Sequence, residues 1–501
     1  MFRLRRICID TMREHIVFVH EAAVAAGEIG FNPVDRVRVT GTNAADGTPH
    51  ELTGTLNFCR DSLIAPDEIG LSEVAFRDLG LPEGAAVRVT LSPAPKSVDL
   101  VRDKLRGGRL DRAAFDAILA DVVRHRYSRV DLAMFVLSCA LRTLDETEII
   151  DFTRAMIDVG RRLDFGPGPI ADKHCVGGVP GNRTSMIVVP IVTALGVTMP
   201  KTSSRAITSP AGTADTMGVL ARVDLSPDDL HRVVRTAGGC VAWGGALDLA
   251  PADDILITVE RPMEIDTEPQ MVASILAKKK TSGATHVLID IPLGPSAKVR
   301  TVDAAERLAG LFQRVGTAIG LRVETIVTEA RGPIGRGIGP RLEALDVLAV
   351  LRRDPDAPRD LREKALYLAA RLLELVGAAT QSGGYRAAQE ALDSGAAAHA
   401  FERIVAAQGP QTMPPEAPHR ATVAAPADGR LRAIDCWEIA RLAKRAGAPV
   451  NPAAGVRLLR TIGDVVARGE PLFEVHAQSM AQLESALAYA ADHPAIASYG
   501  F

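Results

Sequence analysis

The first 93 residues alternate short apolar runs with turn-forming residues. In "DRVRVTG" (35–41) and "AAVRVTLSP" (85–93), apolar and polar side chains follow one another with the period of two that is typical of strands. We therefore expect a small β-rich domain over residues 1–93. The segment "SPAPKS" (92–97) that follows has the composition of a linker.

The period of the pattern changes between residues 98 and 162. In the segment 112–126 the apolar residues recur at helical spacing, and "DLAMFVLSCALRTL" (131–144) predicts a second helix. Thr143 and Glu146 have the spacing of a capping box, which would begin a third helix. This part is expected to be a helical unit. The residues predicted to share the buried face of its first helix are Phe115, Ile118, Leu119, Val122 and Val123.

From residue 170 onward, strand-like runs alternate with helical ones. "SMIVVPIVTALG" (185–196), "THVLIDIP" (285–292) and "LRVETIVTEA" (321–330) are interpreted as strands, and "PQMVASILAKKK" (269–280) as a helix that ends in lysines. Such alternation predicts an α/β sheet with helical crossovers.

The pattern changes again near the end of the chain. Residues 409–428 have the composition of a linker, and "GDVVARGEPLFEVHA" (463–477) has a strand–turn–strand pattern. A small C-terminal domain rich in strands is expected there.

Composition narrows the function classes. The 501 residues are 47% hydrophobic and carry a net charge of −3, and only 4% are aromatic, so neither a basic footprint nor a base-stacking surface for nucleic acid is indicated. The six cysteines form no CxxC pair, which indicates neither a zinc site nor a disulfide framework. No secretory leader and no apolar run of about 18 residues is found. We expect a soluble cytoplasmic protein without a membrane partner.

The stretch "DKHCVGGVPGNRTS" (172–185) carries the first candidate chemistry. Glycines let backbone N–H groups converge on an anion, Lys173 adds a positive charge, and Thr184 and Ser185 add hydroxyl donors next to a helix N-terminus. These groups favour a phosphate. The spacing fits neither a Walker A loop nor a dinucleotide fingerprint. A glycine-rich turn between strand and helix remains the alternative.

A second stretch, "KTSSRAITSPAGTADT" (201–216), is dense in hydroxyl groups and contains Arg205. Two such loops, each after an apolar strand-like run, fit a ligand that binds beyond the carboxyl ends of sheet strands.

Together with "ASILAKKK" (273–280), these stretches resemble the thymidine/pyrimidine-nucleoside phosphorylase family. The variants "VPGN" and "SSRAITS" are similar to its long branch, which includes archaeal AMP phosphorylases. The resemblance covers residues 95–501, and residues 1–93 resemble the extra N-terminal domain of that branch, with a possible role in oligomerisation.

The resemblance implies an α/β domain plus a helical domain, of the nucleoside phosphorylase/phosphoribosyltransferase type, with small β-rich N- and C-terminal domains. The helical domain would comprise 95–165 with 250–285, and the α/β phosphate-binding domain 166–249 with 286–410. A C-terminal α+β domain resembling a hammerhead would span 425–501.

The implied reaction is phosphorolysis of a nucleoside, in which phosphate attacks the anomeric carbon and the base leaves. Thymidine is the first choice of substrate, and a nucleoside 5'-monophosphate such as AMP is the alternative. The resemblance also implies a homodimer or larger assembly. We expect no metal and no cofactor, and inorganic phosphate would be a co-substrate.

The family's functional positions transfer residue by residue. The implied catalytic residues are His174, which would donate to the base, and Asp266, which would act as proton donor. The implied phosphate ligands are Lys173, Cys175, Ser185, Ser203 and Thr213. The implied substrate contacts are Gly178, Ser204, Arg205, Ala206, Ile207, Thr208, Ser209, Arg261, Ser274, Lys278 and Lys298.

Each assignment has a structural alternative. Loop hydroxyls often make only local cap or turn bonds, and lysines near a helix end often only complement its dipole. Cys175 stands where the short branch has a serine. It is expected to act mainly as a small loop residue, although Lys173 and the loop dipoles could lower its pKa. The segment 333–351 departs from the family pattern at Gly339-Pro340-Arg341, so we assign it a structural role.

Two other functions stay open. An anthranilate phosphoribosyltransferase-like enzyme would share the architecture but need Mg²⁺, and no clear acidic motif for that ion lies near the loops. A carrier or scaffold would use the tail, which resembles lipoyl and biotin domains. The tail's lone lysine, Lys444, however, lies in a helix-like run and not at a hairpin tip.

Overall fold

The computed structural model describes residues 1–11, 13–25, 30–206, 209–265 and 267–500. The chain divides into two compact units. Unit 1 contains residues 1–160 and 250–277, and unit 2 contains residues 161–249 and 278–501. Each unit is described by itself.

The N-terminal part of unit 1 is a closed six-stranded barrel with the strand order β1-β5-β2-β4-β3-β6. The runs predicted as strands at 35–41 and 85–93 form β3 and β6, which pair in antiparallel fashion. Their alternation places Val37, Val39 and Val87 inside the barrel with no exposed surface. The elements are β1 (Phe2–Arg6), β2 (Ile16–His20), α1 (Glu21–Ala25), β3 (Arg36–Thr42), β4 (Pro49–Cys59), β5 (Glu68–Leu71), α2 (Glu73–Leu79) and β6 (Ala86–Leu91).

The rest of unit 1 is a helical bundle. As predicted, Phe115, Ile118, Leu119 and Val122 of α4 are buried, whereas Val123 is only half-buried. The predicted capping box at Thr143 is wrong, because α6 begins at Glu146 and its reciprocal bonds are formed by Asp145 and Glu148. The helices are α3 (Ser97–Leu105), α4 (Arg112–Val123), α5 (Arg129–Leu141), α6 (Glu146–Asp158), α10 (Pro251–Met263) and α11 (Glu268–Thr281), whose last residues belong to unit 2.

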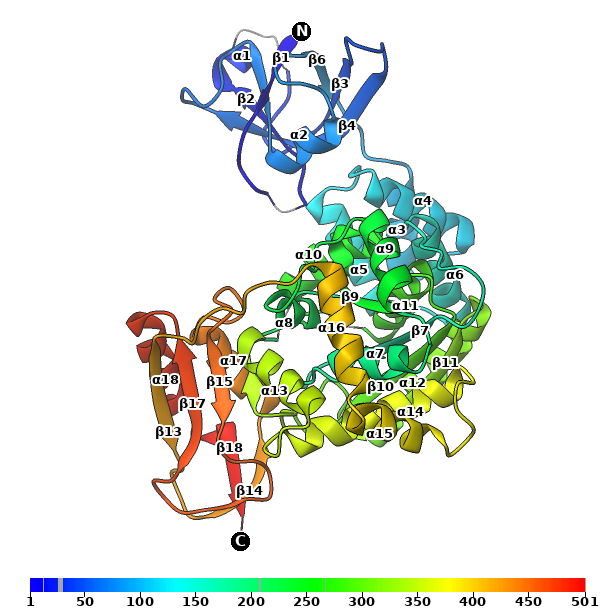
Figure 1. Ribbon diagram of the computed structural model, residues 1–501. Coiled ribbons are helices and arrows are strands. Elements are labelled where there is room, and N and C mark those ends of the chain that lie inside the picture. Colours follow the sequence, from blue (N-terminus) through cyan, green and yellow to red (C-terminus); the bar gives the residue numbers. More distant parts are fainter. Residues whose placement is uncertain (12, 26–29, 207–208, 266, 501) are drawn as a thin grey trace. The chain divides into compact units, whose positions relative to one another are not determined.

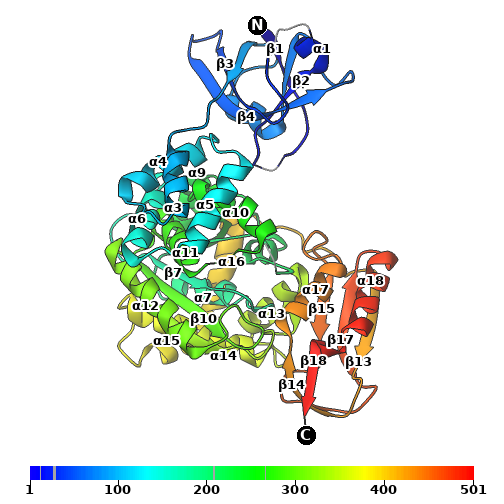
Figure 2. The ribbon, with the colours of Figure 1, turned by 180° about the vertical axis from the view of Figure 1, so that it is seen from behind.

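Unit 2 is built on parallel strands. Strands β11, β10 and β7 form one sheet and β8 pairs with β9, and a parallel bridge between Ile170 and Thr198 connects the two sets. Figure 1 labels β7, β9, β10 and β11 among the helices of the same unit, and Figure 2 shows β7 and β10 from behind. The strands are β7 (Ala171–Cys175), β8 (Met199–Ser203), β9 (Gly239–Trp243), β10 (His286–Leu293) and β11 (Arg322–Glu329).

Helices connect and cover these strands. They are α7 (Ser185–Ala194), α8 (Thr213–Gly218), α9 (Pro227–Ala237), the one-turn η1 (Gly244–Ala246), α12 (Val302–Ala318), α13 (Pro340–Arg352), α14 (Arg359–Leu375), α15 (Gly384–Asp393) and α16 (Ala396–Gln408).

The strand predicted at 185–196 is wrong, because this segment forms helix α7. Every residue from Ser185 to Thr193 is buried, so the helix is apolar on all sides and shows no amphipathic period. Its valines and isoleucines then favour a strand by composition alone. The strands that precede the two hydroxyl-rich loops are therefore β7 and β8.

The C-terminal part of unit 2 contains two small sheets, β12-β15-β17-β13 and β16-β14-β18, with helices α17 and α18. The predicted strand–turn–strand at 463–477 is confirmed as β16 and β17. The predicted linker is wrong in part, since residues 419–424 form strand β13. The elements are β12 (Gly337–Ile338), β13 (His419–Ala424), β14 (Gly429–Ile434), α17 (Cys436–Arg445), β15 (Gly455–Leu458), β16 (Val465–Val466), β17 (Pro471–Ala477), α18 (Met480–Asp492), η2 (Pro494–Ile496) and β18 (Ala497–Gly500).

Three further predictions can be compared with the structure. All six cysteines are free thiols. Among the described helices, none has the length and apolar composition needed to cross a lipid bilayer. Lys444 lies in helix α17 and not at a hairpin tip, which is unlike the lysine of a lipoyl or biotin carrier.

Candidate active site

The loop between β7 and α7 is held by close backbone contacts at two glycines. Gly178 has a φ of +85°, and a Cβ there would lie 2.6 Å from the backbone nitrogen of Lys298. Gly181 has a φ of +73°, and a Cβ there would overlap the carbonyl oxygen of Ile334. Neither position admits another residue without moving the backbone. The loop ends at Ser185, the first residue of α7, so a helix N-terminus follows the glycines as predicted.

Side chains of the same loop form a relay of hydrogen bonds. Lys173 donates from Nζ to Thr184 Oγ1 over 2.8 Å, and Thr184 donates to Asn182 Oδ1 over 3.0 Å. Asn182 in turn donates from Nδ2 to the sulfur of Cys175 at 3.2 Å. The amino group of Lys173 is thus fixed toward the glycine loop. Its side chain is only 1% exposed, and burial lowers its pKa.

The second loop follows β8 and closes on itself. The Asp215 carboxylate accepts from the backbone N–H of Ala206 at 2.6 Å and of Gly212 at 2.9 Å. Ser203 ends strand β8 and is half-buried, and Thr213 begins helix α8 and is buried. Both hydroxyl groups therefore lie on backbone that is fixed by secondary structure.

Arg183, which the sequence interpretation did not single out, connects the two loops. It donates from Nη1 to Thr213 Oγ1 at 3.0 Å and from Nη2 to the carbonyl oxygen of Ala211 at 2.7 Å. Its Nε donates to Glu343 of helix α13, a carboxylate that also accepts from Thr216. Because the bond to Thr213 uses an oxygen lone pair, the hydroxyl keeps its proton for donation. The segment 333–351 thus provides the counter-ion of the arginine that joins the loops.

Alternation along β7 separates two groups of charges, since successive side chains point to opposite faces of the sheet. On one face, the Asp172 carboxylate lies 2.7 Å from Lys279 Nζ and 3.4 Å from Lys201 Nζ, and all three side chains are buried. Burial lowers the pKa of Lys279 despite the attraction of Asp172. Burial, reinforced by the lysines Lys279 and Lys201, holds the pKa of His174 well below its usual range, so its imidazole is neutral at pH 7.

The other face carries Lys173 and Cys175. On the neighbouring strand, Asp290 accepts from Thr328 at 2.6 Å and lies 3.0 Å from Lys364 Nζ. Burial opposes the ionisation of Asp290, but the charges of Lys364 and Lys173 outweigh it and keep its pKa below the usual value.

The suggestion that the loop lowers the pKa of Cys175 is wrong. Burial, together with the negative charge of Asp290, raises this pKa to about 11 in spite of Lys173. The thiol is therefore protonated at neutral pH and can donate a weak hydrogen bond, but it is a poor nucleophile.

Buried or nearly buried basic side chains lie around the two loops, with carboxylates among them. Burial lowers the pKa of Lys173 and of Lys279. The basic residues are Lys173, Arg183, Lys201, Lys279 and Lys364, and the carboxylates are Asp172, Asp215, Asp290 and Glu343.

The structure places the remaining predicted residues as follows. Arg205 is exposed, donates to both carboxylate oxygens of Asp224 at 3.1 Å and lies over the Trp243 ring at 4.8 Å. Ser209 donates to the carbonyl oxygen of Ala211 at 2.8 Å. Ser204 and Lys298 are exposed in unit 2. Ile207, Thr208 and Asp266 lie outside the described residues.

Three predicted contacts for the base lie on helices α10 and α11. Arg261, near the end of α10, is exposed, and partial burial lowers its pKa. Ser274 and Lys278 are one turn apart on α11 and both half-buried, which confirms that they share one face of this helix.

Comparison with known proteins agrees with this arrangement. Residues 98–160 match the helical bundle domain of the glycosyl transferase family, and residues 167–398 match the a/b domain of the same family. Residues 430–497 match the pyrimidine nucleoside phosphorylase C-terminal domain.

Curated relatives extend the match over nearly the whole chain. A protein of Polaromonas sp. (strain JS666) named "Putative thymidine phosphorylase" is 50% identical over 98% of this chain and 94% of its own length. The chain belongs to the thymidine phosphorylase family. "Putative thymidine phosphorylase 1" of Acidovorax sp. (strain JS42) is also 50% identical, over 97% of this chain and 94% of its own length. Membership makes the protein a pentosyltransferase.

Solved structures show the shared fold. The anthranilate phosphoribosyltransferase of Thermus thermophilus is 19% identical, with a TM-score of 0.52 over 62% of this chain and 99% of that one. The Saccharomyces cerevisiae enzyme, solved with PRPP and Mg, is 13% identical, with a TM-score of 0.51 over 62% of this chain and 97% of its own. At these identities, the likeness between this chain and the two solved structures concerns the fold and not the substrate.

Proposed function

We propose that this enzyme cleaves the N-glycosidic bond of a pyrimidine nucleoside with inorganic phosphate, and that thymidine is its substrate. Thymine and 2-deoxyribose 1-phosphate would be the products. The observation that carries the proposal is the group of buried basic side chains and hydroxyl donors next to a glycine loop and a helix N-terminus, an arrangement suited to a small dianion.

Phosphate would bind between the two loops. The donors on its side are Lys173, the hydroxyls of Ser185, Ser203 and Thr213, and the protonated thiol of Cys175. Arg183 supports them, because its bond to Thr213 keeps the second loop at a fixed distance from the first. A rigid set of donors stabilises charge in the transition state without reorganisation.

In the proposed reaction, a phosphate oxygen forms a bond to the anomeric carbon while the bond from this carbon to the base nitrogen breaks. Negative charge then develops on the departing base, and the sugar acquires oxocarbenium character. His174 is neutral and keeps one N–H, which suits it to donate to a base carbonyl. Asp266 would supply the proton, and Arg261, Ser274 and Lys278 would bind the base. No cofactor beyond phosphate is required.

A second candidate substrate is a nucleoside 5'-monophosphate. A Cβ at Gly178 would lie 2.6 Å from the backbone nitrogen of Lys298, so the two backbones lie close together. By resemblance, these two residues match substrate-contacting positions of the family's long branch, which includes AMP phosphorylases. An exposed lysine beside the glycine loop offers a charge for a 5'-phosphate.

The decisive experiment measures base release from thymidine, uridine, thymidine 5'-monophosphate and AMP, each with and without phosphate. We expect thymine release that requires phosphate and yields 2-deoxyribose 1-phosphate. Lys173→Met purified in the same way controls for a contaminating host enzyme. Equal release without phosphate would contradict phosphorolysis, faster release from a monophosphate would favour the second substrate, and a requirement for Mg²⁺ and a pyrophosphorylated sugar would favour a phosphoribosyltransferase.

A further inference from the structure

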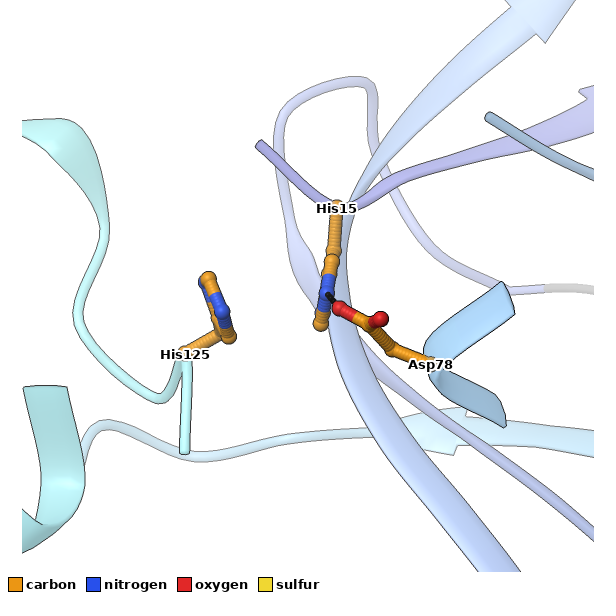
Figure 3. Close-up of side chains that lie close together, drawn as sticks. All are labelled: His15, Asp78 and His125. Carbon is orange, nitrogen blue, oxygen red and sulfur yellow. Dashed lines mark hydrogen bonds and ion pairs between the residues drawn. The ribbon is translucent and has the colours of Figure 1, made fainter. Parts of the chain in front are cut away.

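Two histidines and an aspartate lie close together in unit 1 (Figure 3). His15 immediately precedes strand β2 of the barrel, Asp78 lies in helix α2, and His125 follows helix α4 of the bundle. One ligand atom from each of the three residues lies within 4.8 Å of the others. The two imidazole rings have centroids 3.9 Å apart at an angle of 31°.

Both ring nitrogens of His15 face an acceptor oxygen. Its Nδ1 lies 3.1 Å from the carbonyl oxygen of Thr53, and since a carbonyl only accepts, Nδ1 carries a proton. Its Nε2 lies 3.0 Å from Oδ2 of Asp78, which as a carboxylate also only accepts. Either Nε2 also carries a proton, which gives the ring two in all, or the lone pair of Nε2 and the carboxylate of Asp78 bind the same metal cation.

The geometry resembles that of a metal ligand pair. A histidine that binds a metal usually donates its other ring N–H to a carbonyl or carboxylate, as His15 does to Thr53. Two ligands about 2.0 to 2.2 Å from one tetrahedral zinc ion lie roughly 3.3 Å apart, close to the separation of Nε2 and Oδ2.

His125 contributes a second imidazole from the bundle. Its φ of +54° is uncommon for a residue other than glycine. Arg36 of the barrel donates to its carbonyl oxygen and so fixes this conformation. Backbone strain of this kind is often found at ligand sites.

Charged groups surround the cluster. Arg13 pairs with Asp254 at 3.1 Å. Arg77 Nε lies 3.2 Å from Oδ1 of Asp78, and Oδ2 of the same carboxylate is the atom that faces His15. The side chain of Asp78 is 38% exposed, which gives an ion a path from solvent.

We propose that His15, Asp78 and His125 bind a divalent zinc ion that fastens the N-terminal barrel to the helical bundle. Two imidazole nitrogens and one carboxylate oxygen suit zinc, with water in the fourth position. The ion joins ligands from both parts of unit 1, so its effect is on stability. Cysteine spacing predicted no zinc site, and histidines far apart along the chain give no local signal of one.

The test uses the full chain with Cys8→Ser, because the exposed thiol of Cys8 could itself bind zinc. The protein is stripped with EDTA, titrated with zinc sulfate by calorimetry, and analysed for bound metal and for its midpoint of thermal unfolding. We expect about one zinc per chain and a higher midpoint with zinc. His125→Asn and Asp78→Asn should each lose this zinc and the gain in midpoint.

His50→Asn is the matched control. His50 is another barrel histidine whose Nδ1 lies 2.8 Å from a carbonyl oxygen, that of Leu79, and this variant should keep the zinc. Circular dichroism verifies folding, and if His125→Asn does not fold, the partly exposed Asp78→Asn decides. Absence of stoichiometric zinc in the parent chain, or its retention in Asp78→Asn, would overturn the proposal and leave a protonated His15 paired with Asp78.

Discussion

Arg183 donates a hydrogen bond of 3.0 Å to the hydroxyl oxygen of Thr213, and this bond joins two loops that lie 30 residues apart in the sequence. The same guanidinium group is neutralised by Glu343, which is 1% exposed. A buried arginine with a planar fork can hold both loops and the carboxylate at once, whereas a lysine cannot.

Replacing Arg183 should therefore damage both stability and phosphate binding. Arg183→Met leaves the carboxylate of Glu343 buried without its partner, which typically costs about 3 to 5 kcal/mol of unfolding free energy. The double variant Arg183→Met/Glu343→Gln should recover most of that loss but keep a raised KM for phosphate. Denaturant unfolding and steady-state kinetics measure the two effects. A normal KM in the double variant would show that Arg183 has no part in positioning the loop.

The thiol of Cys175 should be unreactive at neutral pH. With its pKa raised to about 11, it becomes a thiolate only in strongly alkaline solution. Iodoacetamide labelling followed by mass spectrometry should therefore modify the exposed Cys8 first, and Cys175 only as the pH rises above about 9. Cys175→Ser should keep kcat within a few-fold, because a hydroxyl is the better donor to phosphate. Rapid labelling of Cys175 at pH 7 would contradict the protonated state.

The pH dependence of stability should reveal the buried lysine pair next to Asp172. Burial lowers the pKa of Lys279 from 10.5 to about 7 in the folded chain. Between these two pH values, the unfolded chain therefore binds a proton at this lysine that the folded chain does not. The contribution of Lys279 to the free energy of unfolding must then rise as the pH increases between these two values. Lys279→Met removes this difference in bound protons between the two states. The slope of the unfolding free energy against pH should therefore become smaller than in the parent chain. Lys96→Met, at an exposed lysine of unit 1, serves as the comparison. An unchanged slope in Lys279→Met would mean that the ordinary pKa persists.

The sequence predicted the two loops of the site better than it predicted the contacts between the buried residues Asp172, Lys201 and Lys279. Glycines, hydroxyls and Lys173 lie within one short stretch, so their chemistry is visible locally. Asp172, Lys201 and Lys279 come together only because β7, β8 and α11 meet in space, and no spacing rule predicts such a contact. The three residues nonetheless adjoin predicted ones, and the alternation of β7 separates Asp172 from Lys173 by face.

The error at 185–196 has a similar cause. A helix buried on every side has no polar face, and its β-branched residues match a buried strand equally well. Length was the available signal, since strands usually have three to ten residues and this run has about twelve.

Two lysines of unit 2 should affect different substrates. Lys173 donates to Thr184 next to the glycine loop, whereas Lys278 lies on α11 one turn after Ser274. A lost hydrogen bond to a charged group costs about 1.5 to 3 kcal/mol, or roughly one to two powers of ten in rate. We therefore expect Lys173→Met to raise the KM for phosphate with any nucleoside. Lys278→Met should lower kcat/KM for the nucleoside by a factor that depends on the base.

Both variants lose one ammonium group, so a general electrostatic effect would change both parameters alike. Kinetics with each substrate varied in turn distinguish these cases, and circular dichroism confirms that the variant of the buried Lys173 is folded. The same pattern in both variants would contradict the assignment of Lys173 to phosphate and Lys278 to the base.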